Sequence, residues 1–443
     1  MNIKRDIERI RRRLAVTLML LGMIASPAGV WARIQGVTGV QGPKGPVFHL
    51  TAGSFHITTP DGHSLLMWGY GIAGSKTQYP GPTLIVNEGD QVTVTLTNQG
   101  LPMPVSILFP GQHRVVATGG STGQITREST GPNDTVTYTF VASHPGTYTY
   151  YSGTRPGLQV EMGLVGALIV RPKAGADHAY NDPATRFDRE YLLLLTEVDQ
   201  AVHTQVELGH LDQINNTLTH STLWFINGRN GPDTLYDDNV GWMPHQPYGA
   251  LVRMHPGEKV LMRVIGGGRE LHPFHTHGNN FTLIARDGRE LSSGPGQGID
   301  LAVSDYTLQV QPGATYDAIF EWTGEKLGWD IYGTTAGGRP HTCVDNDGDG
   351  FDETTHEYCP DHEKPIPVIL PENQQLTFGP FYSGSPFLGV LGNLPPGEGG
   401  MNLYGGMYFM WHSHSERELT NDNIYPGGML TMLIVEHPSV PIP

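Results

Sequence analysis

The chain has 443 residues, a length that accommodates two or three domains with cores of their own. Only 16% of the residues are charged, while 58 glycines and 34 prolines indicate many short strands and turns rather than long helices. The net charge of −16 argues against a partner with a phosphate backbone, so we expect no nucleic-acid binding.

The N-terminal segment has the pattern of an export signal. Basic residues between Lys4 and Arg13 precede an apolar run from Leu14 to Ile24, and Val30-Trp31-Ala32 fits a cleavage site of small residues. The apolar run is about 11 residues long, against the roughly 20 that span a bilayer. We therefore expect a signal peptide over residues 1–32, no membrane span and a periplasmic or secreted protein. A membrane anchor is the alternative, and the choice between general and twin-arginine export stays open.

A strand signature occurs twice along the chain. Glu88-Gly89-Asp90 leads into apolar residues at positions 92, 94 and 96 that alternate with threonines, which predicts a strand with one apolar face. The signature returns as Pro256-Gly257-Glu258 before the apolar run 260–265, and a second echo pairs residues 148–153 with 408–414. The repeat predicts an all-β protein of two Greek-key β-sandwich domains.

The repeat also predicts the limits of the domains. The first covers residues 33–173, the linker 174–187 and the second domain 188–443. Echoed elements are further apart in the second half, which indicates an insertion at about 335–378.

The insertion contains an acidic loop of the calcium-binding type. Asp345, Asp347 and Asp349 have the carboxylate spacing of an EF-hand-type loop, in which the carbonyl of Phe351 would be the next ligand. The final glutamate of that motif is missing at its usual position, so Glu353 or a neighbouring acidic residue would complete the shell. The alternative is an acidic surface turn without an ion.

Two cysteines, Cys343 and Cys359, bracket this loop and are the only ones in the chain. Cysteines that enclose a short loop usually pair in an oxidising compartment, so we expect a disulfide. Two free thiols are the alternative.

Two histidine doublets lie more than a hundred residues apart. His275 and His277 form the first, and His412 and His414 form the second. In an extended strand the side chains at i and i+2 leave the same face, so two such strands side by side would collect four imidazoles. Neutral imidazole suits copper and zinc, and the doublets therefore predict a metal site.

These doublets resemble the two C-terminal copper motifs of the multicopper oxidases. The first motif reads His272-Pro273-Phe274-His275-Thr276-His277-Gly278, and Tyr79-Pro80-Gly81-Pro82-Thr83, Phe225-Ile226-Asn227-Gly228 and Gly428-Met429 are similar to the family's framework. The resemblance covers nearly the whole mature chain and favours a laccase-like form with two cupredoxin-like domains. It implies a copper cofactor, a small-molecule or metal-ion substrate, and assembly as a homotrimer.

The resemblance also identifies copper ligands that this chain lacks. Where the family has His-Trp-His-Gly the chain reads Leu108-Phe109-Pro110-Gly111, and where it has His-Ser-His the chain reads Tyr151-Ser152-Gly153. Four of the eight ligands implied for a trinuclear cluster are therefore missing. Ser413 stands at the cysteine position of the blue copper site, and Glu418 stands at the position of its second histidine. Serine cannot form the copper–sulfur bond that defines this site.

We therefore predict an exported copper-binding oxidoreductase with a mononuclear or half-trinuclear copper site and no blue copper. Besides the two doublets, His272 and Met429 are potential copper ligands, and Tyr151 and Glu418 are candidates for a catalytic role. Two alternatives remain: a non-catalytic protein that sequesters copper, and a calcium-stabilised structural protein with a vestigial cluster. The sequence leaves open whether the protein turns over a substrate.

Overall fold

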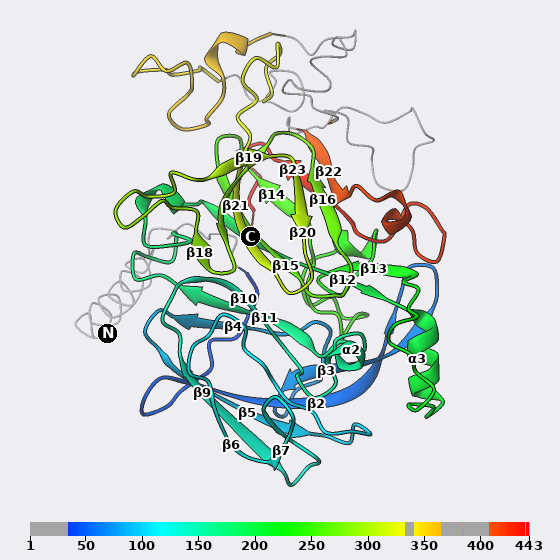
Figure 1. The fold of residues 1–443 in the computed structure, drawn as a ribbon. Helices are drawn as coiled ribbons and strands as arrows, with labels where there is room; N and C mark the ends of the chain where they lie inside the picture. Colours follow the sequence, from blue (N-terminus) through cyan, green and yellow to red (C-terminus); the bar gives the residue numbers. More distant parts are fainter. Residues whose placement is uncertain (1–33, 333–340, 365–383, 385–406, 439, 443) are drawn as a thin grey trace, which may run out of the picture.

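Residues 34–332, 341–364, 384, 407–438 and 440–442 are described by the computed structural model. Within them the protein is nearly all β, as the sequence predicts, and Figure 1 shows its strands gathered into two halves. The predicted signal peptide lies outside the described residues, and so does part of the predicted insertion. None of the described helices is both long and apolar enough to cross a membrane.

The first sandwich, formed by the strands between residues 40 and 171, contains a six-stranded sheet, a three-stranded sheet and a two-stranded ribbon. The six-stranded sheet has the order β1-β2-β5-β9-β6, with β3 paired to β2, and the three-stranded sheet has the order β10-β11-β4. The strands are β1 (Val40–Gln41), β2 (Pro46–Thr58), β3 (Ser64–Ile72), β4 (Gly81–Asn87), β5 (Gln91–Asn98), β6 (Val116–Gly119), β7 (Ser121–Thr122), β8 (Arg127–Glu128), β9 (Thr135–Val141), β10 (Gly146–Tyr151) and β11 (Val165–Arg171).

The second sandwich, formed by the strands between residues 189 and 435, pairs a seven-stranded sheet with a five-stranded sheet. Their orders are β13-β12-β15-β21-β17-β18, with β19 on β17, and β14-β23-β22-β16-β20. The strands are β12 (Arg189–Val198), β13 (Leu223–Ile226), β14 (Val252–Met254), β15 (Lys259–Gly266), β16 (His272–Thr276), β17 (Phe281–Arg286), β18 (Arg289–Glu290), β19 (Val303–Asp305), β20 (Thr307–Val310), β21 (Thr315–Glu321), β22 (Tyr408–Ser413) and β23 (Leu430–Val435).

The repeat in the sequence appears as a repeat in topology. In the first sandwich β5 is parallel to β2 and antiparallel to β9, and in the second β15 is parallel to β12 and antiparallel to β21. Likewise β11 lies between β10 and β4, as β23 lies between β22 and β14. The predicted alternation on β5 is confirmed, because its apolar residues are buried and the threonines between them are half-buried. The predicted domain limits stay predictions.

Each sandwich closes over an apolar core between its two larger sheets. The inward faces of the strands contribute alternate side chains, as expected for sheets that pack face to face. Representative core residues are Phe48, Val94, Tyr138 and Leu168 in the first sandwich, and Val264, Phe274, Trp411 and Leu433 in the second.

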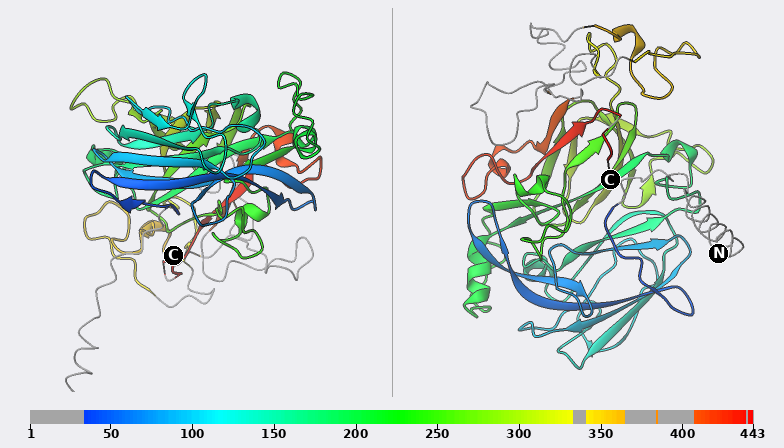
Figure 2. Two further views of the ribbon diagram at one scale, coloured as in Figure 1. Left: turned by 90° about the horizontal axis from the view of Figure 1, so that it is seen from below. Right: turned by 180° about the vertical axis from the view of Figure 1, so that it is seen from behind.

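Among the described residues, helical segments are few and short. They are α2 (Pro156–Gln159), α3 (Gln200–Glu207) and the 3-10 turns η1 (Pro183–Thr185), η2 (Asp233–Leu235), η3 (Cys359–Asp361) and η4 (Glu416–Leu419). Helix α3 follows β12 of the second sandwich but packs against β3 of the first. The rear view in Figure 2 shows the resulting arrangement, with the blue and cyan strands below the green-to-red strands.

A buried ionic network joins the two sandwiches. Arg171 on β11 donates to Glu190 on β12 at 2.6 Å, and Arg263 on β15 donates to the same carboxylate at 2.9 Å. Arg263 also donates to Thr147 on β10 at 3.1 Å, and Thr147 in turn donates to Asp317 on β21 at 2.5 Å. Burial alone would raise the pKa of Glu190, but the guanidinium groups of Arg263 and Arg171 lower it.

Candidate metal centre

The two histidine doublets lie on neighbouring strands of the second sandwich. Strands β16 and β22 pair antiparallel in a register that places His275 directly opposite His412. Because side chains alternate across a strand, Phe274 and Trp411 enter the core while the histidines leave on the other face. This pairing brings together residues that are 137 positions apart (412 − 275).

Three of the four predicted imidazoles converge. One nitrogen from each of His275, His277 and His412 lies within 4.8 Å of the other two, and the Nε2 atoms of His277 and His412 are 3.3 Å apart. Two ligands at metal–nitrogen distances of about 2.0 Å and a tetrahedral angle would be separated by about 3.3 Å. His414 lies beside this group, with its ring centroid 4.8 Å from that of His275, but its side chain is exposed at the rim.

Hydrogen bonds orient two of these rings. His412 donates from Nδ1 to the carbonyl of Ser413 at 2.6 Å, which leaves its Nε2 lone pair directed at the cluster. The Nδ1 of His275 lies 2.8 Å from the hydroxyl of Thr307. Such partners fix the ring orientation of metal-binding histidines.

Electrostatics keep the rings neutral. Burial and the neighbouring imidazoles lower the pKa of His275 to about 4, and they lower that of His412 to about 4 against its hydrogen bond to Ser413. Both rings are thus unprotonated near neutral pH, as a metal ligand must be. The donor set therefore fits copper.

The structure does not bring His272 to this cluster. His272 leaves the opposite face of β16 and is fully buried, where its Nδ1 donates to Glu418 at 2.9 Å and its Nε2 to Glu197 at 3.0 Å. The Glu418 oxygen that accepts from His272 also accepts from the Ser413 hydroxyl at 2.7 Å. Burial alone would lower the pKa of His272, but the two carboxylates raise it to about 9.

These contacts do not fit a blue copper site. A carboxylate oxygen lies between His272 and Ser413, and both ring nitrogens of His272 are engaged by carboxylates. Met429, the predicted axial ligand, is buried in the core, and its backbone bonds to Ser413 and Glu418. The thiolate that defines the site is absent. We therefore assign no copper to this position.

The corresponding strand ends of the first sandwich are apolar. Leu108 and Tyr151 pair through two backbone hydrogen bonds of 2.7 and 3.2 Å, as the histidine strands pair in the second sandwich. A Cβ added at Gly153 would meet the side chain of Leu108 at 2.6 Å, so leucine fills the space beside this glycine. The ring of Tyr151 packs against an apolar cluster that includes Phe55 and Val165. The structure thus places Tyr151, a candidate catalytic residue, in this apolar cluster.

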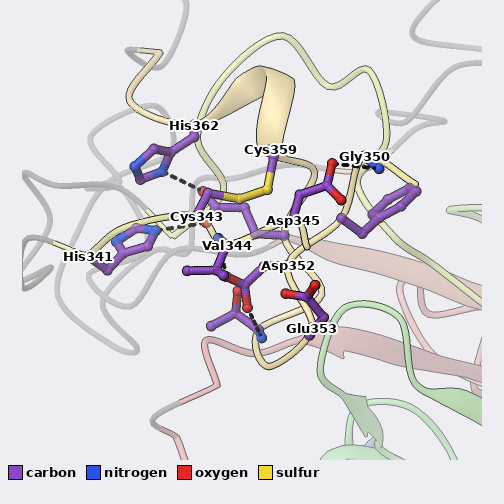
Figure 3. Close-up of a disulfide and its surroundings, with 12 residues drawn as sticks. His341, Cys343, Val344, Asp345, Gly350, Asp352, Glu353, Cys359 and His362 are labelled. Atoms are coloured by element: carbon purple, nitrogen blue, oxygen red, sulfur yellow. Dashed lines mark hydrogen bonds and ion pairs between the residues drawn. A yellow bond between two sulfur atoms is a disulfide. The ribbon is translucent and has the colours of Figure 1, made fainter. Parts of the chain in front are cut away.

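Figure 3 shows the disulfide and the acidic loop of the insertion. Cys343 and Cys359 form the predicted disulfide. The carboxylates of Asp345, Asp347 and Asp349 lie within 4.8 Å of one another and are exposed. Glu353 is not part of this group of three, but it reaches the same loop, where it accepts from the N–H of Asn346 at 2.5 Å. The Phe351 N–H donates to Asp349 at 2.8 Å, and the ring of Phe351 packs against that of Tyr358 with centroids 5.4 Å apart.

Sequence reasoning missed two residues that matter here, Glu197 and Thr307. Glu197 follows the run Leu192-Leu193-Leu194-Leu195-Thr196 on β12, and an acidic residue beside such an apolar run is a usable signal for a buried ion pair. Thr307 carried no signal, because its role depends only on the pairing of β20 with β16.

Comparison with known proteins identifies the family of this chain. Family models described as multicopper oxidase match residues 67–175 and 212–323. The chain is 31% identical to L-ascorbate oxidase of Cucurbita pepo var. melopepo over 175 residues, which are 38% of this chain and 30% of the relative. It is 26% identical to copper resistance protein A of Escherichia coli over 291 residues, 57% of this chain and 44% of the relative. The matched regions thus span less than half of these relatives.

Solved structures agree with this fold. The multicopper oxidase mgLAC superposes with a TM-score of 0.54 at 20% identity, covering 90% of this chain and 87% of its own. The blue copper oxidase from Nitrosomonas europaea gives a TM-score of 0.54 at 20% identity, covering 87% and 85%. Both sandwiches are therefore cupredoxin-like, as predicted. With two matched family models, one in each sandwich, the chain belongs to the multicopper oxidase family.

Proposed function

We propose that the protein is an exported copper-dependent oxidoreductase. It works with a mononuclear or half-trinuclear copper site and without blue copper. The observation that carries the proposal is the convergence of His275, His277 and His412, with the Nε2 atoms of His277 and His412 3.3 Å apart. Three or four imidazoles are enough to hold one copper ion tightly.

The chain's own residues divide the work at this cluster. Thr307 and the carbonyl of Ser413 hold two rings in place, while the exposed His414 and the half-buried His277 leave one side open to solvent. Copper bound here would supply redox chemistry and an open coordination position for a small molecule.

The ion pair at the blue-copper position has a consequence for substrate access. Because His272 is held between Glu197 and Glu418, the described residues form no blue copper site that could pass electrons to the histidine cluster. The substrate must therefore react at the cluster itself. Tyr306, 48% exposed and with its ring centroid 5.7 Å from that of His275, lines this approach.

Copper binding tests the site. Replacing His412 and His414 by alanine should abolish stoichiometric copper uptake, measured by elemental analysis and electron paramagnetic resonance, because two of the clustered imidazoles are lost. The matched control replaces His113 and His144, a pair of exposed histidines with ring centroids 6.3 Å apart, and should leave uptake unchanged. Equal loss in both variants would move the site elsewhere.

The colour of the copper-loaded protein tests the absence of blue copper. Ser413 supplies no thiolate, so the intense blue absorption of thiolate-bound copper should be missing from the visible spectrum. Its presence at one equivalent of copper would refute the assignment.

Turnover distinguishes an enzyme from a protein that only sequesters copper. The similarity to copper resistance protein A supports sequestration as the alternative function. Oxygen consumption should rise when a phenol, a diamine or cuprous ion is added to the copper-loaded chain, and it should stay at background in the His412→Ala/His414→Ala variant. Copper binding without any oxygen consumption would favour sequestration.

Three further parts of the proposal rest on the sequence pattern and the resemblance. Export through cleavage after residue 32 is tested by N-terminal sequencing of the mature protein, and the trimer by light scattering.

Calcium at the acidic loop is tested by thermal unfolding with and without calcium. Calcium should raise the melting temperature of the wild type but not that of an Asp345→Asn/Asp347→Asn variant. The variant has lost two of the three carboxylates that repel one another and would bind the ion.

A further inference from the structure

A second cluster of metal-ligating side chains lies at the base of the insertion, separate from the histidine doublets. One atom from each of Asp330, His341, Glu357 and His362 lies within 4.8 Å of the other three. Glu357 contacts both imidazoles, at 2.8 Å from Nε2 of His341 and 3.2 Å from Nδ1 of His362. Asp330 is 3.7 Å from the same nitrogen of His362.

The burial of this cluster is unusual. Asp330 and Glu357 are 2% and 1% exposed, while His341 and His362 are partly open to solvent. Two buried carboxylates this close repel each other strongly unless cations neutralise them. The open side of the cluster, formed by the two rings, would allow an ion to enter.

The described part of the insertion has no apolar core of its own. Within residues 341–364 the buried residues are Asp352, Glu357 and Asp361, all of them acidic. Small segments that lack such a core are usually held by disulfides or metal ions. Here the Cys343–Cys359 disulfide supplies one tie.

Two of the three buried acids have partners outside the four-residue cluster. Asp352 accepts from the N–H groups of Val344, Thr354 and Thr355 at 2.7–2.8 Å, and Asp361 pairs with Lys364 at 2.8 Å. Glu357 is the exception, because it faces the two imidazoles.

The position of the disulfide suits a metal-bound arrangement. His341 lies two residues before Cys343, and Glu357 and His362 flank Cys359, so the disulfide holds three donors together. Figure 3 shows His341 and His362 on one side of the disulfide and the acidic loop, with Asp345, on the other. The fourth donor, Asp330, lies between Trp329 and Ile331 of the second sandwich's core, and its N–H donates to the carbonyl of Lys364 in the insertion at 2.9 Å.

We propose that Asp330, His341, Glu357 and His362 bind one zinc ion, which fastens the insertion to the second sandwich. Two imidazoles and two carboxylates are a donor set that zinc accepts in tetrahedral geometry. One divalent ion would neutralise both carboxylates. The role is structural, since Asp330 contributes from the sandwich and the other three donors from the insertion.

Zinc analysis in a chain without the histidine doublet at 412 and 414 tests the proposal. The His412→Ala/His414→Ala variant should retain one zinc ion per chain after gel filtration, and adding Glu357→Gln or His341→Ala/His362→Ala should remove it. Adding Asp345→Asn/Asp347→Asn, on the other side of the disulfide, is the matched control and should leave the zinc in place. Absence of zinc from the parent variant, or zinc retained after both ligand changes, would overturn the proposal.

A second measurement needs no variant that might fail to fold. In the wild-type chain, added zinc should protect His341 and His362 from modification by diethyl pyrocarbonate, mapped by mass spectrometry of the peptides, while the exposed His113 stays reactive. Equal modification of His341 and His362 with and without zinc would contradict the site.

Discussion

At the scale of single residues, the two faces of β16 and β22 carry opposite chemistry. On the outer face burial keeps His275 and His412 neutral, with a pKa of about 4 for each. On the inner face two carboxylates raise the pKa of His272 to about 9. Residues three positions apart on one strand thus differ in charge at neutral pH, because one faces other imidazoles and the other faces glutamates.

The charge of His272 predicts a pH dependence of stability. Its pKa in the folded protein lies above the unfolded value of 6.5, so the stabilisation is complete below pH 6.5 and is lost as the pH rises through about 9. The loss should amount to about 3 kcal/mol in the free energy of unfolding. Urea unfolding of the metal-free protein between pH 6 and pH 10 measures it.

The matched variants are His272→Gln, which should lack this pH dependence, and His113→Gln at an exposed site, which should keep it. Parallel curves for the wild type and His272→Gln would show that His272 is not charged in the folded state.

At the scale of the element, the histidine strands and their counterparts in the first sandwich could be predicted from the sequence. The i, i+2 spacing places His412 and His414 on one face whatever else the fold does, and the motif comparison identifies Leu108 and Tyr151 as their counterparts. The side of the strand on which His272 emerges also follows from alternation. Its partner Glu197 does not, because it comes from another sheet.

The zinc cluster was beyond sequence reasoning. Its four donors are spread over residues 330–362 with no regular spacing, so no periodicity or short motif marks them. Only the fold brings Asp330 to the base of the insertion.

The close packing of Leu108 and Gly153 predicts a coupled effect. Gly153→Ala should destabilise the protein by about 1–3 kcal/mol, because the new Cβ would lie 2.6 Å from the leucine side chain. In the Leu108→Ala background the same change should cost less, with a coupling energy of about 0.5–3 kcal/mol in a double-mutant cycle of denaturant unfolding.

Gly131→Ala is the control for this cycle, since nothing lies within 4 Å of its added Cβ. It should change stability by less than about 0.5 kcal/mol. Strict additivity of the Leu108 and Gly153 effects would show that the two positions do not compete for space.

At the scale of the whole molecule, the two sandwiches are held together by charge as well as by apolar contact. Glu190→Gln should lower the free energy of unfolding by about 3–5 kcal/mol, because it leaves Arg171 and Arg263 buried without their carboxylate. Lys326→Ala, which breaks an exposed ion pair with Glu325, should leave the free energy of unfolding almost unchanged, because solvent screens that pair. Similar losses in the two variants would mean that the network contributes little.

The oxygen of Glu418 that lies between His272 and Ser413 has a consequence for the evolution of this scaffold. Changing Ser413 to cysteine alone sets a thiol against a carboxylate, and changing Glu418 to histidine alone deprives the charged His272 of one of its counterions. Each of these single changes toward a thiolate copper centre therefore passes through a less stable intermediate variant. Descendants of this protein therefore keep the His272 ion pair more easily than they regain a thiolate copper centre.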